Sequence, residues 1–268
     1  MVIDFHTHAF PDSLAPRAIS SLVNKGGINP YDDGTISGLV DVMDCEGVDI
    51  SVILNIATKP EQETNVNNFA LSLTNHNRVI GLGSVFPKSE TSLSEVERLK
   101  AGGVKGIKMH PEYQNFDILD EGMFPLYEKC AELSILIQMH TGGDVAYSAP
   151  YHTSPQKLEK LVSMFPKTTF VFAHMGGYEM WHNAADILTH HDNMYIDTSM
   201  INTIAKIDND DAKRIIENVG EDRVVFGSDM PWGMPSHSMN KILSLKLGKD
   251  VEDKIFYKNA VKLLELDL

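Results

Sequence analysis

The sequence is poor in cysteine, with Cys45 and Cys130 the only two among 268 residues. Two cysteines without a regular spacing exclude a disulfide-stapled scaffold and indicate a reducing compartment, so a cytoplasmic location is expected. Neither cysteine lies in a pattern typical of a catalytic nucleophile. Both are therefore expected to pack as small apolar side chains.

Positive charge and long apolar runs are also scarce. Lys and Arg number 23 against 37 Asp and Glu, which gives a net charge of −14. Such a surface repels phosphate backbones and anionic lipids, which argues against nucleic-acid and membrane-surface partners. No apolar run approaches the roughly 20 residues of a membrane span, and residues 1–6 lack the features of a signal peptide. A soluble protein is expected.

Short apolar runs rich in Val, Ile and Phe recur along the whole chain. Each is too short for a typical helix and has the composition of a parallel strand that is buried on both faces. The eight runs are residues 2–6, 50–57, 79–86, 104–109, 134–140, 168–174, 193–199 and 223–229.

Stretches with helical periodicity lie between these runs. They are residues 38–46, 92–101, 156–164, 210–219 and 256–266. Alternating strands and helices favour a parallel sheet with helical crossovers. Eight such units in 268 residues predict an α/β fold of the closed (β/α)8 TIM-barrel type, one domain over residues 1–268. The competing arrangement is an open, doubly wound sheet.

One long stretch, residues 11–35, shows no clear periodicity and contains several Gly and Pro residues. A loop of that length in a compact domain is usually functional. It is therefore expected to be irregular and to act as a lid or a substrate-binding insertion.

Histidines stand where the predicted strands end. His6 and His8 are separated by one residue, so both imidazoles project to the same face of an extended strand. His140, His174 and Asp229 close the fifth, sixth and eighth runs. In a barrel these ends surround one mouth, where catalytic groups sit. A single histidine at a strand end is more often an ordinary polar residue, but the agreement of five positions predicts a site for zinc or a related divalent metal.

Two further polar residues follow the fourth run. Lys108 lies near its end, and His110 is on the same face if the strand continues, although Pro111 would end it there. Lys108 would either pair with a substrate carboxylate or form a structural ion pair.

Five segments together resemble the amidohydrolase superfamily, and most closely its branch of TIM-barrel metal-dependent hydrolases related to aminocarboxymuconate semialdehyde decarboxylase. The segments are residues 3–8 (IDFHTH), 106–111 (GIKMHP), 140–142 (HTG), 173–177 (AHMGG) and 227–232 (GSDMPW). The resemblance covers nearly the whole chain, and the motifs are specific as a set although His-x-His alone is weak.

The resemblance implies a set of site residues. One divalent ion, with zinc expected first, would be held by His6, His8, His140 and Asp229. His174 and Asp229 would be catalytic and move protons. Lys108 and His110 would bind substrate, and a second metal would enter only if Lys108 were carboxylated.

The resemblance also implies a reaction class. Hydrolysis of an amide, ester or lactone by a metal-activated water is the first expectation. The alternative is non-oxidative decarboxylation of a cyclic or unsaturated carboxylic acid at the same ligands, and a third reading is a non-catalytic metal-binding barrel. The partner is expected to be a small molecule, a carboxylate if Lys108 binds it; self-association is common among such barrels, but no interface residue stands out.

Overall fold

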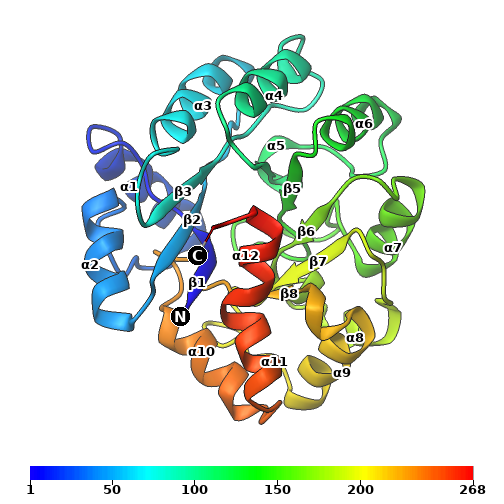
Figure 1. The fold of residues 1–268 in the computed structure, drawn as a ribbon. Helices are drawn as coiled ribbons and strands as arrows, with labels where there is room; N and C mark the ends of the chain where they lie inside the picture. The colour runs from blue at the N-terminus through cyan, green and yellow to red at the C-terminus, as the bar shows by residue number, and fades with distance from the viewer. Residues whose placement is uncertain (268) are drawn as a thin grey trace.

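The computed structural model describes residues 1–267, which form a ring of parallel strands surrounded by helices (Figure 1). The strands coincide with the eight apolar runs predicted from the sequence. They are β1 (Ile3–Thr7), β2 (Ile50–Leu54), β3 (Val79–Leu82), β4 (Gly106–Met109), β5 (Leu136–Met139), β6 (Phe170–Phe172), β7 (Met194–Asp197) and β8 (Val224–Val225).

The ring is closed at two seams. Strands β1–β3 and β4–β8 form two hydrogen-bonded sheets. A parallel bridge between Gly83 and Ile107 joins β3 to β4, and another between Thr7 and Met230 joins the first strand to the segment after β8. The Phe5 amide also donates to the Phe226 carbonyl over 2.8 Å. The predicted closed TIM barrel is therefore confirmed, and the open doubly wound sheet is excluded.

Burial explains why the strands read as unbroken apolar runs. Every residue of β1, β2, β4 and β5 is buried. One face of each strand packs inside the barrel and the other packs under the helices, so both faces need apolar side chains.

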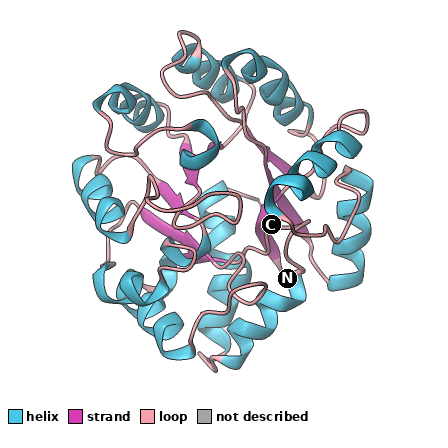
Figure 2. Ribbon diagram, turned by 180° about the vertical axis from the view of Figure 1, so that it is seen from behind, coloured by secondary structure: helices cyan, strands magenta, loops and turns pink. Residues whose placement is uncertain are grey.

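The helices lie outside the ring (Figure 2). All five stretches with helical periodicity are helical, although the last begins as a π-helical turn at Lys254–Lys258. The α-helices are α1 (Ala15–Gly26), α2 (Ile36–Glu46), α3 (Glu63–Ser72), α4 (Ser92–Ala101), α5 (Pro111–Gln114), α6 (Phe124–Glu132), α7 (Pro155–Met164), α8 (Trp181–Ile187), α9 (Asn209–Val219), α10 (Pro235–Ser244), α11 (Lys249–Asp253) and α12 (Asn259–Leu264). Within residues 1–267, no helix combines the length and apolarity that crossing a bilayer would require.

Helix α12 lies across one end of the barrel (Figure 1). Its Ala260 and Leu264 belong to a buried apolar cluster with Ile3, Val171 and Val225 from the strands. This cluster fills the end at which the strands begin. Polar chemistry is therefore confined to the opposite end, where the strands finish.

The segment 11–35 differs from the expectation of an irregular loop. Residues 15–26, about half of it, form helix α1, which has Pro16 in its first turn, where proline is tolerated. The helix ends at Gly27, whose φ of 70° suits glycine and whose amide donates to the Val23 carbonyl over 2.8 Å. The glycines and prolines that suggested an irregular loop mark the ends of this helix.

Candidate active site

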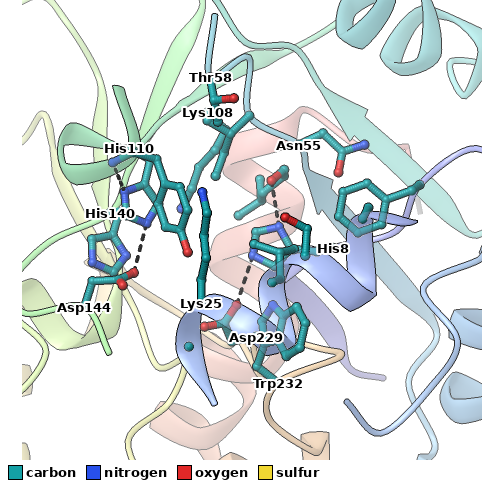
Figure 3. Close-up of a pocket in the computed structure, with 18 of the residues that line it drawn as sticks. His8, Lys25, Asn55, Thr58, Lys108, His110, His140, Asp144, Asp229 and Trp232 are labelled. Atoms are coloured by element: carbon teal, nitrogen blue, oxygen red, sulfur yellow. Dashed lines mark hydrogen bonds and ion pairs between the residues drawn. The ribbon is translucent and has the colours of Figure 1, made fainter. Parts of the chain in front are cut away.

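A pocket of about 730 Å³ opens at the ends of the strands (Figure 3). Its inner wall carries His6, His8, Lys108, His140 and Asp229, all predicted from the sequence to lie at the barrel mouth. The rest of the lining is largely apolar and includes residues from helix α1, which overhangs the opening.

Three predicted metal ligands meet at the base of this pocket. The His8 Nε2 atom lies 3.0 Å from Asp229 Oδ1, and the His6 Nε2 atom lies 3.4 Å from the same oxygen. Figure 3 shows the contact between His8 and Asp229. Their potential ligand atoms all lie within 4.8 Å of one another, which is close enough for one ion to bind all three.

The hydrogen bonds of the two imidazoles fix which nitrogen is free. His8 Nδ1 lies 2.8 Å from the Leu54 carbonyl, and His6 Nδ1 lies 2.7 Å from Asp197 Oδ2, so both Nδ1 atoms donate and carry the proton. The Nε2 lone pairs then face the Asp229 carboxylate, which is itself an acceptor. The two Nε2 lone pairs and the carboxylate oxygen repel one another unless a cation lies between them. The three groups therefore fit a divalent metal.

The charge states agree with this arrangement. Burial lowers the pKa of His6 to about 4, and the Lys108 ammonium acts in the same direction. For Asp229, burial alone would raise the pKa, but His6 and His8 outweigh it and hold the pKa below its ordinary value. Near neutral pH, His6 is therefore a neutral imidazole and Asp229 a carboxylate, the protonation states in which these side chains bind metal.

Asp197 at the end of β7 holds the histidines in place. Its carboxylate accepts from His6 Nδ1, from Gln138 Nε2 at 2.5 Å and from the His174 amide at 3.0 Å. The Ser199 hydroxyl also donates to it. This carboxylate is fully buried. A carboxylate on the far nitrogen of a ligating histidine fixes its tautomer and orientation.

His174 and His140 form a chain that ends at the same carboxylate. His174 Nε2 lies 3.0 Å from His140 Nδ1, His140 Nε2 lies 3.0 Å from the Gly143 carbonyl, and His174 Nδ1 lies 2.8 Å from Ser199 Oγ. With the bond from Ser199 to Asp197 the chain has four contacts. Two neutral imidazoles and one hydroxyl supply only three protons, so the chain has room for one more proton or a metal ion.

Lys108 lies on the inner wall of the pocket without a polar neighbour in hydrogen-bond distance among the described residues. Its side chain is buried, and within residues 1–267 its Nζ atom has no hydrogen-bond partner. Burial lowers the pKa of this lysine to about 8, and Asp197 and Asp229 oppose that shift. A buried ammonium without a protein partner is costly, so an anion bound in the pocket would stabilise it. The alternative of a structural ion pair for Lys108 is wrong for the described residues.

His110 lies outside the group formed by His6, His8 and Asp229. Its ring stacks on His140 with centroids 3.9 Å apart and 9° between the planes. Its Nε2 atom lies 3.4 Å from Asp144 Oδ2, and its Nδ1 atom accepts from the Tyr113 amide at 3.3 Å. Asp144, His110 and His140 form a second possible ligand group, but parallel stacked rings direct their lone pairs alongside each other rather than toward one ion.

Two of the predicted catalytic residues have unusual backbones. His174 has a φ of 59° and Asp229 a φ of 74°, both in the left-handed region that favours glycine. The Asp229 amide donates to the His6 carbonyl over 2.8 Å. Ser228, which precedes Asp229, is held by Asp4. The Asp4 carboxylate accepts from the Ser228 amide at 2.9 Å and from the Ser228 hydroxyl. Strain of this kind is often stored at functional sites.

The structure thus brings all seven predicted site residues to one end of the barrel. His140 faces His174 and His110 rather than the group of His6, His8 and Asp229. Sequence analysis missed Asp197, Ser199 and Asp144. Asp197 and Ser199 lie at the end of the seventh predicted strand, residues 193–199, so the signal that identified the chosen residues would have identified them. Asp144 is in a loop, where the sequence pattern gave no indication.

A family model described as Amidohydrolase matches residues 3–266. This match covers nearly the whole chain and all the motifs on which the resemblance was based.

Solved structures share the fold. An uncharacterized TIM-barrel protein from Bordetella bronchiseptica is 19% identical with a TM-score of 0.76, and 98% of each chain is covered. 5-Carboxyvanillate decarboxylase from Novosphingobium aromaticivorans, with bound manganese and 3-methoxy-4-hydroxy-5-nitrobenzoic acid, is 15% identical with a TM-score of 0.73, covering 99% of this chain and 97% of that one.

A probable 2-pyrone-4,6-dicarboxylic acid hydrolase from Acinetobacter baumannii, with citric acid bound, is 15% identical with a TM-score of 0.71, and 99% of each chain is covered. At these identities the comparisons show a common barrel. They do not identify the reaction, which must be inferred from the residues of the pocket.

Proposed function

The chain belongs to the amidohydrolase family, and from this premise we propose that it is a metal-dependent decarboxylase of a small cyclic carboxylic acid. His6, His8 and Asp229 would hold one divalent ion, with zinc the first to test and manganese the second. We keep His140 as the fourth ligand, which requires its Nδ1 atom to exchange the hydrogen bond to His174 for the ion.

The observation that carries the proposal is the unpartnered ammonium of Lys108. This ammonium lies close enough to His6 to lower the pKa of that histidine, and close enough to Asp229 for the carboxylate to raise the pKa of Lys108. A carboxylate that pairs with Lys108 is therefore at the ligand group itself, not at the outer end of the pocket. The acid group of the substrate is then the group at which the reaction occurs.

When bound, the divalent ion would supply a Lewis acid that orients the substrate and stabilises negative charge. The protein supplies the rest. Decarboxylation breaks the bond between the carbon and the carboxylate, leaves the electron pair on that carbon and requires one proton there. With His140 bound to the ion, His174 Nδ1 donates to Ser199 and Ser199 donates to Asp197, so His174 Nε2 is free to carry the proton and would deliver it.

The apolar lining has its own part in this reaction. Leu54, Met200 and Trp232 line the pocket beside the ligand group. Such a wall would exclude water from the reacting carbon, so that the proton comes from the site rather than from solvent. The decarboxylase among the similar structures supports the same choice.

Hydrolysis is the second candidate, favoured by the state of Asp229. This carboxylate has a pKa held below its ordinary value and lines the pocket, so it could take a proton from an attacking water. Lys108 would then stabilise the oxyanion of an ester or lactone. Hydrolysis was the first expectation from the sequence. The position of Lys108 beside the ligand group favours decarboxylation instead.

The test is to load the protein with zinc or manganese and offer a panel of aromatic and muconate-type acids, with esters, amides and lactones alongside. We expect CO2 release from at least one acid, reduced about 10²-fold or more in Lys108→Met, since removing the partner of a buried charge typically costs 2–5 kcal/mol. Lys160→Met, on the outer surface of α7, is the matched control. Hydrolysis without CO2 release would overturn the proposal in favour of the second candidate.

A further inference from the structure

We propose that Lys25 on helix α1 forms a second anion-binding subsite, so that the substrate carries two acidic groups. One acid group pairs with Lys108 at the ligand group and the other pairs with Lys25 across the pocket. The inference rests on the proposed function for the first acid group. It adds a class of substrate, a diacid.

The position of Lys25 follows from the helix. Ala18, Ser21, Leu22 and Lys25 share one face of α1, and that face lines the pocket. Figure 3 shows the Lys25 side chain extending into the pocket between Asp144 and Asp229.

The neighbouring residue fixes the end of this helix. Gly26 approaches the loop after β5 so closely that a Cβ atom there would lie 3.1 Å from Val145 Cγ2. The last turn of α1 is therefore packed against the opposite side of the pocket mouth. This contact fixes the end of α1 at the opening, so Lys25 lines the pocket although it is exposed to solvent.

The charge of Lys25 is not neutralised. Within residues 1–267 its ammonium forms no ion pair, and its aromatic partner is Tyr113, whose ring centroid lies 5.2 Å from Nζ. The two carboxylates of the pocket are already engaged: Asp144 faces His110, and Asp229 faces His6 and His8. Some lysines pair with carboxylates, as Lys157 does with Asp117 and Lys249 with Asp253. Others such as Lys160 form no ion pair within residues 1–267, so Lys25 differs from them by its place in the pocket.

The pocket thus presents Lys108 from β4 and two cations from α1, Arg17 in its first turn and Lys25 in its last turn. Apolar side chains, among them Leu22, Leu54 and Trp232, line the same pocket. A ligand with an apolar body and an acidic group at each end matches that distribution. A monoacid would leave the Lys25 ammonium without a partner.

The test uses benzoate and the three benzenedicarboxylate isomers as probes, titrated calorimetrically into the manganese-loaded protein. We expect at least one dicarboxylate to bind about tenfold more tightly than benzoate, which corresponds to one charge-assisted hydrogen bond of about 1.4 kcal/mol. Lys25→Met should abolish this preference without changing the affinity for benzoate. Lys25→Arg keeps the charge and should keep the preference, and Lys160→Met should keep it too.

Several results would overturn the subsite: equal binding of all four probes or no binding of any, a preference that survives in Lys25→Met, or one that disappears equally in Lys160→Met. The last would show a general effect of net charge. The proposed function can fail while the subsite holds. That outcome is a dicarboxylate preference in a protein that releases CO2 from no acid in the panel.

Discussion

The base and the rim of the pocket are built in opposite ways. We call His6, His8, His174, Asp197 and Asp229 the floor cluster. Its members are almost completely buried, with the His6 and Asp197 side chains 2% and 0% exposed. Their polar atoms contact one another or the backbone, as His6 does with Asp197 and His8 with the Leu54 carbonyl.

The rim consists of residues 11–35, which include α1, and residues 144–153. Its apolar side chains are partly open to solvent, with Leu14 37%, Val145 45% and Tyr147 38% exposed. Lys25 of the rim has no anionic partner in the described residues, and its ammonium lies over the Tyr113 ring. The rim is therefore incomplete without a ligand, whereas the floor cluster is arranged before any ligand binds.

This difference separates two roles. A preorganised cluster pays no reorganisation at the moment of reaction, so it suits metal binding and proton transfer. A rim on a surface helix and a loop can differ between relatives without disturbing the floor, so it suits substrate selection. Changes in the floor cluster should lower kcat and metal affinity, and changes in the rim should alter KM.

The largest effect is expected from Asp229→Asn. This change removes a ligand oxygen and the negative charge that faces His6 and His8. Turnover should fall by about 10³-fold because the Lewis acid would be lost with its ligand, and the metal content should fall with it. Asp41→Asn on α2 removes the same charge from an exposed site and should change neither. Unchanged turnover in Asp229→Asn would remove this residue from the mechanism.

A smaller loss is expected from Asp197→Asn, because this residue acts through His6 and His174. The asparagine keeps the shape but presents an amide group that cannot accept on both sides. Metal affinity should weaken about 10- to 100-fold, as found for carboxylates that orient ligating histidines. Metal titration with a fluorescent competitor measures it. A normal metal affinity with a lowered Tm would mean that Asp197 is only structural.

Two glycines give a direct contrast between floor and rim. A Cβ atom at Gly227 would lie 2.9 Å from the His6 Cβ atom, so Gly227→Ala should displace a floor histidine and lower kcat about tenfold or more. A Cβ atom at Gly34 would lie 2.6 Å from Ile19 on α1, at a φ of 76°. Gly34→Ala should therefore shift the rim and raise KM several-fold, with kcat within about twofold.

The two variants are compared by steady-state kinetics on the same substrate. If Gly34→Ala lowered kcat as much as Gly227→Ala, the floor and the rim would be coupled, and the separation of roles would be wrong.

The smallest effect concerns the stability of the rim. Burial raises the pKa of Asp32 to about 6, whereas the Thr35 side chain and amide lower the pKa of the exposed Asp33. The fold therefore loses stability at Asp32 as the pH rises from about 4 through 6, and Asp33 adds stability above about pH 4. At pH 7, Asp32→Asn should raise Tm by about a degree or more and Asp33→Asn should lower it. At pH 4 the Asp32→Asn difference should shrink because Asp32 is protonated, whereas the Asp33→Asn difference should shrink only below about pH 4. Shifts of one sign at pH 7 would contradict the pKa directions.

Much of the fold could be predicted from the sequence because its signals are local. Strands buried on both faces must be apolar throughout, so all eight runs were visible. The helix α1 was not, because the Gly and Pro residues at its ends resemble those of an irregular loop.

The site was predictable to the same degree. His6, His8 and Asp229 could be brought together because the barrel places the ends of strands at one mouth. The orientation of His140 toward His174 and the missing partner of Lys108 depend on side-chain packing between distant segments. No periodicity or motif encodes such contacts.

We propose centrally that His6, His8, His140 and Asp229 hold one divalent ion beside an unmodified Lys108. Elemental analysis of the purified protein, combined with intact-mass measurement under non-denaturing conditions, tests it most directly. We predict one metal ion per chain and no carbon dioxide adduct on Lys108. Two ions per chain with a carboxylated Lys108, or no ion after incubation with zinc and manganese, would contradict the account.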